Sequence, residues 1–163
     1  MPSTKVTPAL VLAVLTFANL GCAGPGVSLR ADGSPGPEKC SDEALKTMRI
    51  LRLQPGESAF IEIDANQTDQ SPVTLTDGPV ESFLDEDLGT LPVTTRVYGR
   101  IWTGGPNVVI RYYEARPPNG DRIPICAVAR SAYGGLTKLP ESRPGVAVLK
   151  LSRAAMWIVD DFR

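Results

Sequence analysis

Proline and glycine interrupt this chain every few residues, and their spacing limits the length of any regular element. The sequence contains 15 prolines and 15 glycines among 163 residues, while 42% of its residues are hydrophobic. Proline is excluded from helix interiors, and both residue types favour turns. Because the apolar content is sufficient for a core, we expect a fold built mainly of short strands joined by many turns.

Several runs between these turns alternate between apolar and polar residues, as half-buried strands do. The runs 96–102, 108–114 and 122–130 are separated by glycine-containing turns, which predicts a three-stranded antiparallel meander. Other runs predict further strands at 58–64, 73–75, 79–84, 146–151 and 155–159. The runs 73–75 and 79–84 flank a turn at Asp77-Gly78. One short helix is expected over 41–48, with Ser41 as its N-cap.

The predicted fold class is therefore mainly β, with one short N-terminal helix. About six strands form a sheet of ordinary size, and a small antiparallel barrel or a sandwich is the natural way to close it. The domain that contains these elements spans residues 40–163, which is the size of a single β-rich domain.

The N-terminus has the pattern of an export signal. Lys5 precedes the apolar run 9–20, which is followed by small residues. As a helix the run would reach only ~18 Å, against a hydrocarbon core of ~30 Å. A removable signal peptide over residues 1–22 is favoured over a buried N-terminal helix, because a Gly/Pro-rich stretch follows at once.

Leu20-Gly21-Cys22 resembles the lipobox of bacterial lipoproteins, in which cleavage leaves a lipid-modified cysteine at the N-terminus. That family prefers leucine where Asn19 stands, and ordinary cleavage after Ala23 is the alternative. The resemblance implies lipidation of Cys22, attachment to a membrane through the N-terminal lipid, and a place in the bacterial outer membrane or periplasm. Ordinary cleavage would give a secreted protein.

The stretch 23–39 contains four glycines and three prolines and has no apolar period, which predicts a flexible tether. Cys40 and Cys126 follow it, and an exported compartment permits them to form a disulfide. Closing a loop of about 85 residues would contribute roughly 4–5 kcal/mol of stability. Two buried free thiols are the alternative.

The chain contains no histidine, which excludes Ser-His-Asp, Cys-His and His-metal chemistry. It also lacks the common nucleophile, phosphate-loop and calcium-loop motifs. Its 17 basic and 18 acidic side chains give no overall field that would favour nucleic acid. The sequence thus indicates no catalytic residue, no cofactor, no metal and no nucleic-acid partner.

Two groups of acidic residues are the strongest candidates for catalysis or cation binding. Asp85-Glu86-Asp87 could bind a hard cation, and Glu62 with Asp64 could form a carboxylate pair for hydrolysis. Solvated loop charges and strand alternation explain the same patterns without chemistry.

Cations and aromatic residues are interleaved on one face of the predicted meander. These candidate ligand-binding residues are Arg96, Tyr98, Arg100, Trp102, Arg111 and Tyr113. Such a face could stack on sugar rings or bind an anionic polymer. Alternatively, the arginine stems and tyrosine rings simply cover the outside of the sheet.

Three segments, 40–45, 91–105 and 118–126, together with the leader and the Gly/Pro stretch, resemble small exported proteins of myxobacterial type. No established activity accompanies this resemblance. Some such proteins are labelled serine/threonine kinases, but this chain has no Gly-rich nucleotide loop, His-Arg-Asp or Asp-Phe-Gly motif. A fainter similarity, over 91–99 and 118–125, links the chain to the β-barrel of the outer-membrane scaffold subunit of type IV secretion systems, which implies a barrel fold only.

These observations favour a non-enzymatic cell-envelope lipoprotein or secreted β domain that binds a partner protein or a polysaccharide. One alternative is a glycan hydrolase that uses carboxylates alone, which requires two converging acids in a cleft. Another is a structural component of an envelope or secretion assembly, which requires a large exposed apolar patch.

Overall fold

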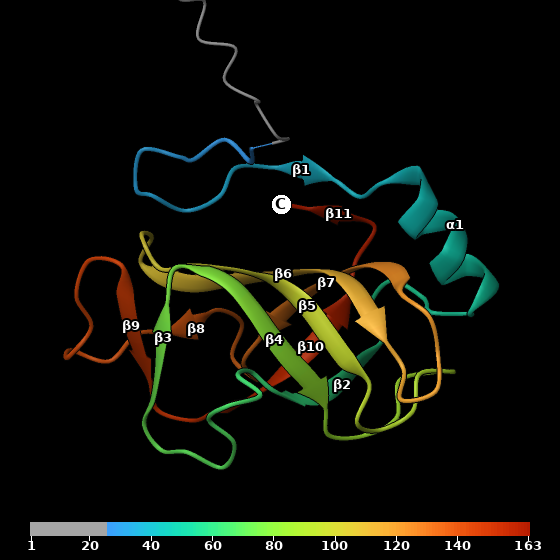
Figure 1. The fold of residues 1–163 in the computed structure, drawn as a ribbon. Coiled ribbons are helices and arrows are strands. Elements are labelled where there is room, and N and C mark those ends of the chain that lie inside the picture. The colour runs from blue at the N-terminus through green and yellow to red at the C-terminus, as the bar shows by residue number, and fades with distance from the viewer. Residues whose placement is uncertain (1–25) are drawn as a thin grey trace, which may run out of the picture.

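A computed structural model describes residues 26–163, so the predicted signal peptide and Cys22 lie outside the described residues. The chain within this range forms one helix, α1, which spans Asp42–Ile50, and eleven strands (Figure 1). The strands are β1 Glu38–Lys39, β2 Ser58–Glu62, β3 Val73–Thr76, β4 Gly78–Leu84, β5 Arg96–Trp102, β6 Asn107–Arg116, β7 Ile123–Arg130, β8 Leu136–Thr137, β9 Val146–Leu149, β10 Arg153–Ile158 and β11 Asp161–Phe162.

Six antiparallel strands form a closed barrel in the order β5-β4-β2-β10-β7-β6, with β8 added at one end of β6. The ring closes because β5 pairs with both β4 and β6. Closure leaves no free edge in the ring, which removes the usual site of edge-to-edge aggregation. The predicted mainly β fold is confirmed, with a barrel rather than a sandwich, and β5, β6 and β7 form the predicted meander.

Two short ribbons accompany the barrel. β3 pairs with β9, and β1 pairs with β11, which lies above the barrel in Figure 1. The predicted strands at 73–75 and 79–84 exist, but they do not pair with each other. Only Asp77 separates β3 from β4, which is too short for a hairpin loop. Gly78, with φ at +128°, redirects the chain into the barrel instead.

The barrel interior is apolar, as the alternation in its strands predicts. Its fully buried residues include Ile61, Val97, Ile110 and Met156. Tyr112 enters this core, and its hydroxyl lies 2.8 Å from the hydroxyl of the buried Ser82. The Ser82 hydroxyl in turn donates to the backbone carbonyl of Ile63. The polar atoms of the interior are therefore satisfied, as buried hydroxyls must be.

A β-bulge in β6 sets the orientation of the residues that face outward. Tyr98 pairs with Glu114 and Gly99 pairs with Tyr112, so Tyr113 is an extra residue in this strand. Glycine is required at the bulge, because a Cβ on Gly99 would collide with the carbonyl oxygen of Arg111. Tyr112 consequently points into the core, while the residues on either side of it point outward.

The predicted helix is present and is anchored to the barrel at its start. The Ser41 side chain caps it, accepting a hydrogen bond of 3.1 Å from the backbone N–H of Ala44. Met48 is buried against β7. Cys40 and Cys126 form a disulfide with Cα atoms 5.8 Å apart, which confirms the predicted pairing.

Part of the stretch predicted as a flexible tether lies against the barrel. Ser34, Pro35 and Gly36 are buried, and β1 makes a ladder with β11. The prediction of a flexible tether is therefore wrong for these residues. They are held in place because the backbone of Gly36 and the side chain of Glu38 bind the buried Arg111 of the barrel.

The one helix within residues 26–163, α1, is not long and apolar enough to cross a bilayer.

Candidate functional site

The structure divides the predicted cation and aromatic face into an exposed row and a covered cluster. In the exposed row, Arg96 pairs with Glu81 at 3.2 Å. Arg116 stacks on the ring of Tyr98 at 5.4 Å and pairs with Glu114 at 3.6 Å. These cations already have carboxylate partners, and exposed pairs of this kind contribute little to stability.

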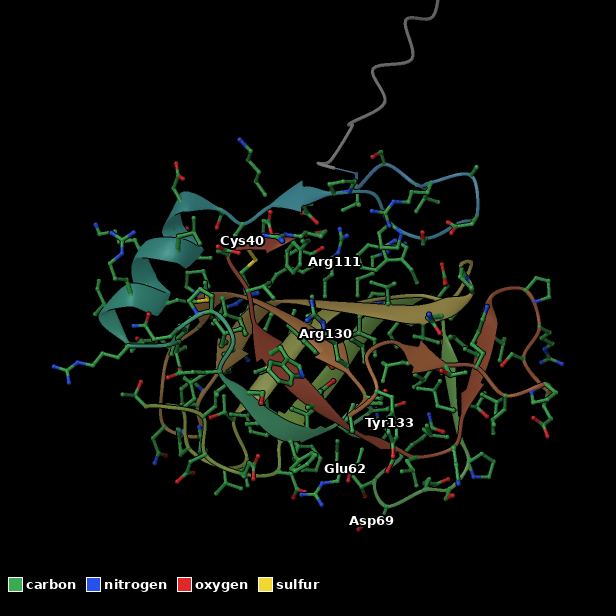
Figure 2. All side chains as sticks on the ribbon, turned by 180° about the vertical axis from the view of Figure 1, so that it is seen from behind. Cys40, Glu62, Asp69, Arg111, Arg130 and Tyr133 are labelled. Atoms are coloured by element: carbon green, nitrogen blue, oxygen red, sulfur yellow. A yellow bond between two sulfur atoms is a disulfide. The ribbon has the colours of Figure 1, made fainter. Side chains whose placement is uncertain are left out.

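Arg111 is the centre of the covered cluster, with only 1% of its surface exposed. Its Nη2 donates to the carbonyl of Gly36 at 2.8 Å, and its Nη1 contacts Glu38 Oε2 at 3.2 Å. The guanidinium also lies between the rings of Trp102 and Phe162, at 5.5 and 4.9 Å from their centroids. Figure 2 shows Arg111 between the N-terminal segment and the barrel.

Tyr113 completes this cluster. Its hydroxyl donates to Glu38 Oε2 at 3.0 Å, and its ring meets Phe162 edge-on at 5.3 Å. Burial raises the pKa of Tyr113, and the hydrogen bond to Glu38 raises it further. Tyr113 therefore remains a neutral donor near pH 7. Together Arg111 and Tyr113 fasten the β1–β11 ribbon to the outside of the barrel.

Arg100 differs from the other cations of the predicted face. It is exposed and stacks on the Trp102 ring at 5.6 Å, while Trp102 itself is only 5% exposed. Within residues 26–163, no carboxylate pairs with Arg100 and no hydrogen bond holds its guanidinium. Arg100 is therefore the cation of this face that remains available to a ligand.

Arg100 and Trp102 border a groove of about 480 Å³, here called the N-terminal groove. Its other lining residues include Val27, Glu38 and Asp77. Both of these carboxylates are engaged, Glu38 by the Arg111 cluster and Asp77 by the backbone N–H of Thr103 at 2.5 Å. Of the three charged residues that line the groove, Arg100 alone has no hydrogen-bond or ion-pair partner within residues 26–163, so its guanidinium is open to an anionic group.

The acids proposed for catalysis or cation binding serve local structure. Glu62 accepts from the backbone N–H of Asp69 at 3.3 Å, and Asp64 accepts from that of Asn66 at 2.9 Å. In the 85–87 run, Asp85 pairs with an arginine of β10, and the next two acids bind backbone N–H groups. Across the described part of the chain, no three Asp, Glu or Cys side chains are grouped so as to hold a metal ion.

A second groove, of about 530 Å³, lies on the outer face of β6, β7 and β10 and was missed by sequence reasoning. Its most prominent residues are Arg130 and Trp157. The sequence does carry a signal for it, since Ala155 and Trp157 alternate with the buried Met156 and Ile158. We call it the Trp157 groove.

Comparison with protein-family models finds no match for this chain, and a search of curated proteins finds none that is significantly similar. The chemistry of the two grooves therefore rests on their own residues.

Proposed function

We propose that the protein is a non-enzymatic binding domain of the bacterial cell envelope, and that it binds an anionic polymer through the N-terminal groove. The observation that supports this most directly is the unpaired guanidinium of Arg100, stacked on Trp102 at the border of the groove. A cation held on an aromatic face has a fixed direction, so it loses little freedom when it binds an anion. The volume of the groove lies within the range of ordinary ligand sites.

Binding accounts for the acidic residues better than hydrolysis does. A carboxylate glycosidase needs one acid free to donate a proton and a second free to act as base or nucleophile. Glu62, Asp64 and Asp85 each hold a partner within the fold instead. The exported, membrane-attached location proposed for the domain follows from the lipobox resemblance of Leu20-Gly21-Cys22.

Changing Arg100 to Ala is expected to lower the affinity for dextran sulfate, used as the probe polyanion, by about tenfold, because one charge-assisted contact is lost. The affinity is measured by titration calorimetry at low and at physiological salt, and it should fall as salt rises. Arg96→Ala is the matched control, since it removes an exposed cation of the same strand that is already paired with Glu81. The proposal is contradicted if the two variants lose affinity for dextran sulfate equally, or if Arg100→Ala loses none.

Changing Cys22 to Ser in the full-length chain is expected to move the protein from the membrane fraction to the aqueous fraction. The lipid would be lost, and acyl chains contribute ~0.8 kcal/mol of membrane affinity per buried methylene. Fractionation of a bacterial host, with detergent phase separation, measures the change. Cys40 and Cys126 provide the control, since their disulfide should form in both proteins. Unchanged membrane retention of Cys22→Ser eliminates the lipid anchor.

A further inference from the structure

The floor of the Trp157 groove is a row of outward-facing side chains from three paired strands. Val128 of β7 pairs with Trp157 of β10 on one side and with Arg111 of β6 on the other. Beside this row, the exposed Arg130 lies opposite the small side chain of Ala155. The floor therefore offers an indole ring and a valine, with Arg130, labelled in Figure 2, beside them.

Polar groups around this floor have hydrogen-bonding capacity that the fold does not use. The indole Nε1 of Trp157 is buried and has no acceptor among the residues that the structure describes. Arg130, Asn107 and Asp160 also line the groove, and within the same range none of their side chains has a hydrogen bond or an ion pair. The groove thus presents both donors and acceptors, and the buried Nε1 of Trp157 is the unusual one, because most buried polar groups in proteins are already paired.

The charges of the Trp157 groove are balanced. The lining contains Asp160 as well as Arg130, so these two charges offset each other. Arg163 pairs with Asp161 at 3.0 Å, and Arg111 is neutralised by its own partner in the covered cluster. A strongly anionic or cationic ligand therefore gains no net attraction here.

A hydrogen-bonded turn carries a further aromatic residue beside the groove. Ser131 and Gly134 exchange two backbone hydrogen bonds of 2.9 and 3.1 Å, and Gly134 has φ at +110°, which favours glycine. Tyr133 stands at the tip of this turn and is fully exposed, while Gly134 and Gly135 line the groove. The Tyr133 ring is therefore open to contact with a ligand that extends beyond the groove.

We propose that the Trp157 groove binds a neutral oligosaccharide. Sugar hydroxyls both donate and accept hydrogen bonds, which matches the mixture of unused groups, and the C–H face of a sugar ring is flat and apolar, which matches the floor. An extended peptide is less suitable, because β6, β7 and β10 are each paired on both sides and offer no backbone edge for strand addition. The residues that line this site are different from those that line the proposed polyanion site, and its ligand needs no charge.

Titration calorimetry and tryptophan fluorescence with chitohexaose, cellohexaose and maltohexaose test the proposal. We expect at least one of them to bind with little dependence on salt, and Trp157→Ala to weaken that binding by about tenfold or more. Trp157→Phe keeps an aromatic ring and removes the N–H, so its loss of affinity should be smaller than that of Trp157→Ala. Arg130→Ala, at an exposed position that folding tolerates, should weaken binding several-fold even if Trp157→Ala is poorly folded.

Arg100→Ala serves as the control that separates the two grooves. It should leave oligosaccharide binding unchanged, while Trp157→Phe should leave dextran sulfate binding unchanged. Absence of binding by all three oligosaccharides at ~10 mM overturns the proposal. Equal affinity in the wild type, Trp157→Phe and Arg130→Ala overturns it as well, because the sugar would then bind elsewhere.

Discussion

Replacing both Cys40 and Cys126 with serine is expected to lower the free energy of unfolding by roughly 4–5 kcal/mol, the loss that chain entropy assigns to opening a loop of this length. The two cysteines are 86 residues apart, and Cys40 lies between β1 and α1. The bond therefore holds both elements to β7. Because small domains are stable by only about 5–15 kcal/mol, the loss is a large share of the total.

Urea unfolding followed by circular dichroism measures this loss, and wild-type protein in reducing buffer should reproduce it. The matched control is Arg96→Ala, which changes an exposed residue away from the disulfide and should unfold at nearly the same urea concentration as the wild type. Peptide mapping without reductant should recover Cys40 joined to Cys126. An unchanged midpoint in the double variant, or two alkylatable thiols in the native exported protein, would reject a stabilising bridge.

Changing Arg111 to Ala is expected to lower the free energy of unfolding by about 3 kcal/mol, the lower end of the cost of removing one partner from a buried ion pair. The lower end applies because 30% of the Glu38 side chain remains exposed and can be solvated. The variant also removes the cation between the rings of Trp102 and Phe162 and leaves the Gly36 carbonyl without its donor.

Hydrogen exchange separates a local effect of this variant from a global one. Backbone amides of residues 34–39 and of β11 should exchange faster in Arg111→Ala, while those of β2, on another part of the barrel, keep their protection. Arg96→Ala is the control, since loss of its exposed pair should cost no more than about 1 kcal/mol. Arg111→Met tests whether packing alone can hold the ribbon. Unchanged exchange at residues 34–39 would show that Arg111 does not fasten them.

Local patterns were sufficient to locate most strands and to pair neighbours along the chain, but not to pair strands that are distant in the sequence. Alternation predicted 96–102 as a strand with its observed limits, and the turns around it predicted the β5-β6-β7 meander. Pairing of β3 with β9, or of β2 with β10, joins segments far apart in the sequence. Each of these strands has an apolar face that several partners could cover, so the choice depends on closure of the whole ring.

Local patterns also predicted only part of the candidate site, because they do not show contacts between distant segments. Alternation correctly placed Arg96, Tyr98 and Arg100 on the outside of the barrel. It could not show that Trp102 and Arg111 are covered, because the cover comes from a Gly/Pro-rich stretch whose composition is typical of a linker. Short backbone contacts such as the Gly36 carbonyl leave no periodic trace in a sequence.

The β1–β11 ribbon joins the first and last strands of the described fold, and this has a consequence for the order of assembly. A nascent chain that lacks β10 and β11 cannot close the ring, since β10 fills the space between β2 and β7. Until those last segments emerge, the guanidinium of Arg111 has only part of its cover and β1 has no partner. Emergence of β10 and β11 thus controls when β1 docks, and a domain held by such long-range strand pairing should fold only after β11 has emerged.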